Sequence, residues 1–304
     1  MMRRILSLLP SATEIVAALG ASNELVGRSH ECDFPAEVAR LPVCTAPKVR
    51  VTGTSEEIHR SVTEVLERDI SVYRVDGEML RSLRPDVIVT QVQCDICAVS
   101  LRDVEAVVGE WMGGDEPRIV ALNPSTVSSI CSDIGLVAEA IGRDARGLLR
   151  TMQVRIDAMA GRAQSAAARP VIATIEWISP LMAAGNWVPE LIELAGGRNA
   201  LGMAGRHSPW IHVADLMATD PDIIVVMPCG FSIEKSLADL PLLTGDATWR
   251  SLRAVRNGRV FVADGHSFFN RPGPRIVESL EILAEMVHPE LFDFGHRQTD
   301  WVVA

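Results

Sequence analysis

The sequence predicts an α/β protein of two lobes, each with a mostly parallel sheet, joined by one long helix. One pattern occurs once in each half of the chain, at 83–90 and 219–226: a helix end, a Pro-Asp turn and an apolar, β-branched run. Such apolar strands are typical of parallel sheets covered on both faces. Between the two, 144–168 contains no Pro, is rich in Ala, Leu, Met, Arg and Gln, and is followed by Pro170, so we expect a helix there.

The bulk composition narrows the functional classes. With 304 residues, 48% of them hydrophobic and 22% charged, the chain can bury a core in two domains. The net charge is -10 and no basic stripe is present, which argues against a nucleic-acid partner. No apolar run is long enough to span a bilayer, so we expect a protein that is not membrane-spanning.

The first lobe is predicted over 1–142. It begins with a buried strand at 4–9, and Ser11 with Glu14 has the spacing of a capping box that opens a helix ending before Gly20. A second strand at 25–28 leads into a polar loop.

An insertion is predicted in this lobe at 48–74. A helix within it should run from Ser55 through Leu66. No function is assigned to it.

The connecting helix is predicted at 143–169 and the second lobe at 170–304. A helix of about two dozen residues would be about 35 Å long and would act as a stiff strut. The second lobe then opens with a strand at 170–175.

The N-terminus bears on localisation. Residues 1–9 imitate a short secretory signal, but Pro10 and Glu14 interrupt the apolar stretch, which suits a strand, a turn and a helix better. The six cysteines lack the spacing of a disulfide scaffold, and a reducing compartment fits them. We expect a cytoplasmic protein, with export as the alternative.

A series of segments along the chain matches a known family in order and spacing: 5–14, 26–35, 83–89, 195–199, 208–210, 220–225 and 268–275. Through them, nearly the whole chain apart from 48–74 resembles the cobalamin-binding periplasmic proteins. These belong to the helical-backbone class of ABC-transporter substrate-binding proteins, which also includes ferric siderophore binders. It implies a cleft between the lobes that holds a small-molecule metal chelate, cobalamin or a related corrinoid, and an ABC permease as partner.

The chain departs from this family at several positions. Gln91 stands where the cobalamin binders have an aromatic residue at a strand end. The resemblance places the carboxylates that dock on a permease near Asp95 and Asp215.

Aromatic residues of the second lobe are candidates for the ligand contact. Trp177, Trp187 and Trp210 fall near predicted strand ends, which face the crevice in an open α/β sheet. Indole offers a flat macrocycle broad apolar surface at little entropic cost. The alternative for Trp177 and Trp187 is core or hinge packing, whereas the resemblance places Trp210 against the ligand.

Polar candidates complete the predicted ligand site. The resemblance places Phe268, Phe269 and Arg271 at the cleft, where Arg271 would meet an amide, phosphate or carboxylate, or else be a rim charge. Glu31 and Gln91 are expected to form hydrogen bonds with the ligand. Glu176 is a further carboxylate that could face the cleft. One of three loop histidines could be an axial ligand to cobalt or iron, namely His207, His212 or His266. The alternative is that these histidines are solvated loop residues.

A zinc site is the competing hypothesis. His30, Cys32, Cys94 and Cys97 would make a Cys3His set if two loops converged, whereas the alternative is that the thiols pack at the base of the cleft. No nucleophile elbow, P-loop, H-E-x-x-H or dinucleotide motif is present. The sequence therefore predicts a binding protein rather than an enzyme. The alternative is a metal-handling protein or enzyme that uses Cys32, Cys94 and Cys97.

Overall fold

The computed structural model describes residues 2–68, 71–93, 99, 101–109 and 116–304. The chain forms two compact units. Unit 1 comprises Met1–Gly53, Glu57–Pro124 and Ser128–Arg150, and unit 2 comprises Thr54–Glu56, Ser125–Val127 and Thr151–Ala304. The lobe boundaries drawn from the sequence, and the cleft between the lobes, stay predictions.

Unit 1 is built on a four-stranded parallel sheet of order β2-β1-β5-β6. The strands are β1 (Ile5–Ser7), β2 (Leu25–Arg28), β5 (Val87–Gln91) and β6 (Arg118–Leu122). The main helices along this part of the chain are α1 (Pro10–Ala18), α3 (Gly77–Leu83), α4 (Leu101–Val108) and α5 (Val127–Ile141). Because the sheet is parallel, the carboxyl ends of all four strands lie at one edge.

The segment predicted as an insertion is flanked by two paired strands. β3 (Thr45–Pro47) and β4 (Tyr73–Val75) are antiparallel, and Pro47 lies opposite Tyr73. Helix α2 (Ser55–Leu66) lies between them with the predicted bounds. The two strands therefore close a loop of chain that can vary in length without disturbing the parallel sheet.

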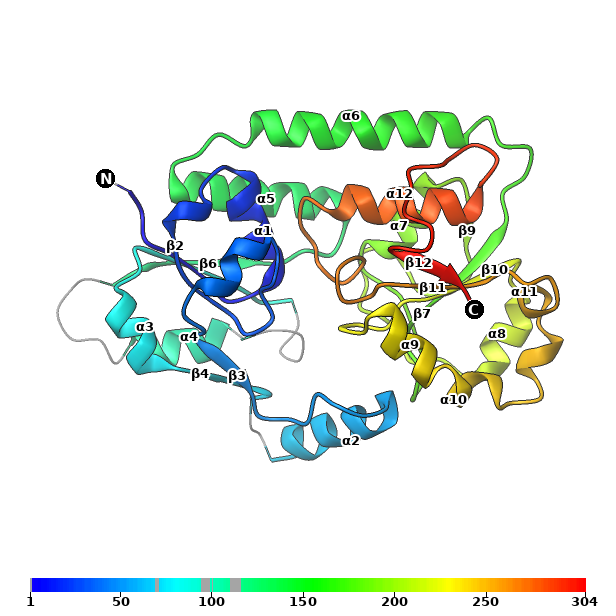
Figure 1. Cartoon of the computed structure of the whole chain (residues 1–304), viewed down its shortest axis with the longest axis horizontal. Helices are drawn as coiled ribbons and strands as arrows, with labels where there is room; N and C mark the ends of the chain where they lie inside the picture. Colours follow the sequence, from blue (N-terminus) through cyan, green and yellow to red (C-terminus); the bar gives the residue numbers. More distant parts are fainter. Residues whose placement is uncertain (1, 69–70, 94–98, 100, 110–115) are drawn as a thin grey trace. The chain divides into compact units, whose positions relative to one another are not determined.

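Unit 2 contains a larger mixed sheet of order β12-β11-β10-β7-β8, with β9 also pairing with β7 (Figure 1). Its central strands pair in parallel, and β8 and β12 are antiparallel to their neighbours. The strands are β7 (Val171–Trp177), β8 (Met182–Ala183), β9 (Arg198–Asn199), β10 (Ile223–Val226), β11 (Val260–Ala263) and β12 (Trp301–Val303). The helices are α7 (Val188–Leu194), α8 (Val213–Thr219), α9 (Ile233–Asp239), α10 (Pro241–Thr244), α11 (Arg253–Arg256) and α12 (Ile276–Val287).

The repeated Pro-Asp turn has the same geometry in both units. The residue before each proline ends its helix in the left-handed region, with φ 42° and 36°. The following carboxylate then accepts a hydrogen bond from the first strand, since Asp86 accepts from the backbone N–H of Arg4 and Asp222 from that of Val171, each at 2.8 Å. The strands that follow are wholly buried. The repeat therefore fixes how a helix returns into the parallel part of each sheet.

Helix α1 corrects one prediction. It begins at Pro10, and its N-cap is Leu9, which has no side-chain cap. The predicted capping box at Ser11 is therefore absent, because proline is preorganised for the first helical position and starts the helix one residue earlier. Ser11 lies inside the helix and is buried.

Helix α6 (Arg146–Ala163) is shorter than predicted, with 18 residues. At its start the carboxylate of Asp144 accepts a hydrogen bond from the backbone N–H of Arg146 at 2.9 Å. At its end the Ser165 hydroxyl donates to the carbonyl of Arg162 at 2.7 Å. These local bonds end the helix well before Pro170. Within the described part of the chain, no helix combines the length and apolar character needed to cross a membrane.

Candidate functional site

The carboxyl edge of the sheet in unit 2 gathers several candidate residues. Trp177 ends β7, Phe231 follows β10 and His266 follows β11. The loops after these strands are joined, because the backbone N–H of His266 donates to the carbonyl of Phe231 at 3.0 Å. This edge is where open α/β sheets bind ligands.

Two tryptophans of this unit lie in one row across the strands. Met182 in β8 pairs with Trp177 and also forms a backbone bridge with Trp210. The register of β7 against β8 shifts between Ile175 and Trp177, and the backbone pairing joins the two tryptophans through the methionine. Trp210 is 57% exposed. The indole of Trp177 is half-buried, with an edge contact to Phe231 at 5.3 Å.

Trp187 and Phe269 meet each other inside unit 2. Trp187 is 5% exposed, and its indole N–H donates to the backbone carbonyl of Phe269 at 2.8 Å. Phe269 is wholly buried. This environment suits packing, so neither residue enters our account of the ligand contacts.

Arg271 supplies a buried positive charge near the same edge. It is 6% exposed, and its guanidinium donates to Nε2 of His266 at 3.1 Å. A guanidinium can only donate, so Nε2 of His266 accepts this hydrogen bond. The loop is held in place by Asp264, whose carboxylate accepts from the backbone N–H groups of His266 and Ser267 at 2.9 and 2.8 Å.

Phe268 contacts two cationic groups. The guanidinium carbon of Arg275 is 5.2 Å from the centre of its ring, and the ring of His296 makes a T-shaped contact with it at 6.4 Å between ring centres. Cations and ring faces attract each other electrostatically. Phe268 is 8% exposed, so its ring is packed inside unit 2.

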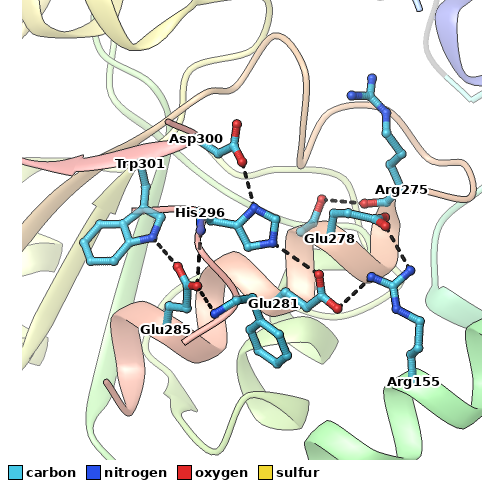
Figure 2. A network of polar contacts seen from close by, with 10 residues as sticks. Arg155, Arg275, Glu278, Glu281, Glu285, His296, Asp300 and Trp301 are labelled. Atoms are coloured by element: carbon cyan, nitrogen blue, oxygen red, sulfur yellow. Dashed lines mark hydrogen bonds and ion pairs between the residues drawn. The ribbon is translucent and has the colours of Figure 1, made fainter. Parts of the chain in front are cut away.

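His296 is the centre of a polar network on α12 (Figure 2). Its Nε2 is 3.2 Å from Glu281 and its Nδ1 is 2.7 Å from Asp300. The hydrogen bond to Glu281, and then that to Asp300, raises the pKa of His296 to about 9. The ring is therefore positively charged at neutral pH.

The network also joins α6 to α12. Arg155 of α6 donates to Glu278 at 2.9 Å and to Glu281 at 2.6 Å. Burial disfavours the charged form of Glu281, but the hydrogen bonds from His296 and Arg155 outweigh it and lower the pKa of this carboxyl. The C-terminal strand is tied in through Glu285, which accepts from the Trp301 indole at 2.8 Å.

The spacing of three glutamates in the sequence is a signal for this network. Glu278, Glu281 and Glu285 have the spacing of one helix face. Three carboxylates on one face of a buried helix need positively charged or donating partners. Those partners come from distant parts of the chain, so they are identified only in the folded structure.

The carboxyl edge of unit 1 holds the polar loop after β2. Glu31 is half-buried and its backbone N–H donates to the Ser29 hydroxyl at 3.3 Å. Gln91 ends β5 and is 4% exposed. Phe34, which was not predicted as a site residue, is 45% exposed on the same loop as Glu31 and offers an apolar surface there.

The proposed zinc ligands are only partly described. Cys32 is a buried free thiol. Cys94 and Cys97, like Asp95, lie outside the described residues. Among the residues whose positions are given, no group of three or more His, Cys, Asp or Glu side chains could hold a metal ion.

The loop histidines of unit 2 differ in their surroundings. His207 is exposed, and its Nδ1 is 3.0 Å from the carbonyl of Ser208. His212 and Asp215 form a capping box at the start of α8, in which Asp215 accepts from the backbone N–H of His212 at 2.7 Å. The permease-docking role of Asp215 stays a prediction.

Comparisons with known proteins agree with the fold. A family model described as periplasmic binding protein matches residues 5–266. The chain is 22% identical, over 95% of its own length and 81% of the relative's, to an uncharacterized ABC transporter substrate-binding lipoprotein of Bacillus subtilis. It is also 22% identical, over 91% of its length and 86% of the relative's, to the vitamin B12-binding protein of Vibrio cholerae.

Solved structures show the same two-lobed α/β fold. A periplasmic heme-binding protein from Pseudomonas aeruginosa matches with a TM-score of 0.71 at 21% identity, over 96% of this chain and 94% of that one. The periplasmic vitamin B12-binding protein of Vibrio cholerae matches with a TM-score of 0.63 at 18% identity, over 94% and 97%. These relatives are binding proteins rather than enzymes, as the sequence predicted.

The cytoplasmic localisation expected from the sequence is wrong. The relatives are periplasmic proteins or a lipoprotein of ABC transporters, which are exported. The apolar run that we weighed as a signal forms β1 in the core, but a strand in the core does not determine the compartment in which the protein works. The match over 5–266 shows that this chain belongs to the periplasmic binding protein family.

Proposed function

We propose that this chain is the substrate-binding protein of an ABC transporter and that its ligand is a corrinoid or a similar metal chelate. The observation that carries the proposal is the row Trp177, Met182 and Trp210. Two strand spacings separate the outer members, so the row is about 10 Å wide. A flat macrocycle needs an apolar surface of about this width.

A fixed polar group accompanies this surface. Arg271 keeps its charge at every physiological pH and is held by His266. Its side chain suits the amide, carboxylate or phosphate groups at the periphery of a chelate. In unit 1, Glu31 and Gln91 are proposed to form hydrogen bonds with the ligand, and Phe34 to pack against it. The relatives named for vitamin B12 and heme support the class of ligand.

The test is a direct binding measurement with cyanocobalamin, hemin and a ferric siderophore, each followed by quenching of tryptophan fluorescence and by calorimetry. We expect one of them to bind at one equivalent. Trp210→Ala should weaken its binding by about 1–3 kcal/mol, because a large exposed aromatic contact is lost.

The matched control is Met203→Ala. Met203 is 67% exposed on the same loop as Trp210, so its loss removes exposed apolar surface without removing an indole. Binding of none of the three chelates would contradict the proposal. Equal affinities of the Trp210 variant and the wild type would show that the tryptophan row is not the ligand surface.

A further inference from the structure

We propose that Nε2 of His30 coordinates the metal of the bound chelate, in place of an exchangeable axial ligand. The inference rests on the proposed function and deepens it by naming the metal contact. The cargo would supply the metal, and this chain would supply one nitrogen. The steps below concern the described residues of unit 1.

The ring of His30 is held by a buried hydroxyl. Thr45 Oγ1 lies 2.7 Å from Nδ1 of His30 and also accepts a hydrogen bond from the backbone N–H of that residue at 3.0 Å. Thr45 donates its own proton to Ser29 Oγ at 3.2 Å. A hydroxyl has a single proton, so in this arrangement the ring N–H donates the 2.7 Å hydrogen bond. The imidazole therefore carries its proton on Nδ1 and a lone pair on Nε2.

This is the state that a metal requires. Metal-bound histidines commonly donate their other ring N–H to a fixed oxygen, which sets the tautomer and the ring orientation. Thr45 is 5% exposed and Ser29 is 3% exposed, so both hydroxyls are fixed by burial. The ring of Tyr73 packs against that of His30 at 5.5 Å. His30 is therefore preorganised before any ligand arrives.

His30 also lies where a ligand can reach it. It follows the end of β2 by two residues, at the carboxyl edge of the parallel sheet, and it is half-buried. Among the residues that the structure places, Nε2 of His30 has no hydrogen-bond partner. The paired strands β3 and β4, which flank residues 48–72, supply Thr45 and Tyr73.

Three other histidines of the chain are engaged differently. Nε2 of His266 accepts from Arg271, and His296 has a carboxylate at each ring nitrogen. His288 has Glu290 at Nδ1 and a backbone carbonyl at Nε2. Nδ1 of His207 lies against a backbone carbonyl, whereas Nδ1 of His30 lies against a hydroxyl. His207 is exposed on a loop. It is therefore the appropriate control.

The chemistry is a ligand substitution. The lone pair of Nε2 forms a bond to the metal, the metal–water bond breaks, and the water leaves. The proton on Nδ1 stays with the hydrogen bond to Thr45, and the oxidation state of the metal is unchanged.

The experiment compares aquocobalamin, which has an exchangeable axial water, with cyanocobalamin, which has a tightly held cyanide, and with hemin. Titration into the wild-type protein should shift the visible bands of aquocobalamin or hemin to those of an imidazole complex. His30→Ala should bind the same chelate without this shift and more than about tenfold more weakly. Its affinity for cyanocobalamin should match that of the wild type, and added imidazole should restore the band.

Thr45→Val is the second variant, because it keeps the size of the side chain and removes the acceptor of the ring proton. It should weaken binding of the aquo form by about tenfold. Binding with no band shift, or a shift abolished by His207→Ala and not by His30→Ala, would overturn the inference while the proposed function stands. Failure of every chelate to bind would overturn the proposed function and this inference with it.

Discussion

Replacing His296 by Gln should remove the part of the pH dependence of the free energy of unfolding that comes from this imidazole. The imidazolium lies between Glu281 and Asp300, at 3.2 and 2.7 Å. Its pKa is about 9 in the folded protein against 6.5 as the ordinary value. Because the folded-state pKa is the higher one, the stabilisation is complete below about pH 6.5 and is lost as the pH rises through about 9.

The magnitude follows from the two pKa values. Proton linkage gives about 2.5 kcal/mol at pH 7, about 1.4 kcal/mol at pH 8 and almost nothing at pH 10. The His296 side chain is 14% exposed, so solvent screens the pair only weakly. Any loss of packing in the Gln variant adds a constant that does not change with pH.

The assay is chemical denaturation followed by circular dichroism, from pH 6 to pH 10, for the wild type and His296→Gln. The difference between the two proteins should shrink across this range by about 3 kcal/mol. A constant difference for His296→Gln from pH 7 to pH 10 would refute the reasoning, since it would mean that the ring is not charged in the network.

Two further substitutions test buried groups. Asp133→Asn should stabilise the protein by up to about 3 kcal/mol above pH 6 and by nothing below about pH 4. The reason is that burial raises the pKa of Asp133 to about 6, while the hydrogen bond from the Asn123 backbone N–H can persist in the variant. Equal denaturation midpoints of the two proteins at pH 8 would contradict this. Trp187→Phe should cost about 1–2 kcal/mol of stability, since the Phe269 carbonyl loses its buried donor, and should leave chelate affinity unchanged. A stable variant that binds chelate weakly would place Trp187 in the ligand site instead.

The elements that could be predicted were those with local signals. The Pro-Asp turns, the apolar strands after them and the helix inside 48–74 all appear where the sequence placed them. The errors were also local. Pro10 competed with the capping spacing at Ser11, and α6 ended at Ala163.

The candidate site residues stay predictions, and the structure separates them by burial. Trp210 was singled out and is exposed, whereas Trp187 was weighed equally with Trp177 and is buried. A tryptophan near a strand end is compatible with a ligand contact and with core packing. Which of the two it makes depends on the face of the sheet that it occupies, and this face depends on the register with other strands. Phe34 and the hydroxyl that holds His30 were missed for the same reason.

By itself the sequence determined the α/β class, the repeated turn, the absence of enzyme motifs and the resemblance to binding proteins, since each of these depends on residues close together in the chain. Only the tertiary structure decided the charge of His296, the pairing of Arg271 with His266 and the row that joins Trp177 to Trp210 through Met182. Arg155 and Glu281 are 126 positions apart. The state of an ionisable group depends on neighbours and burial, and folding alone brings such distant residues together.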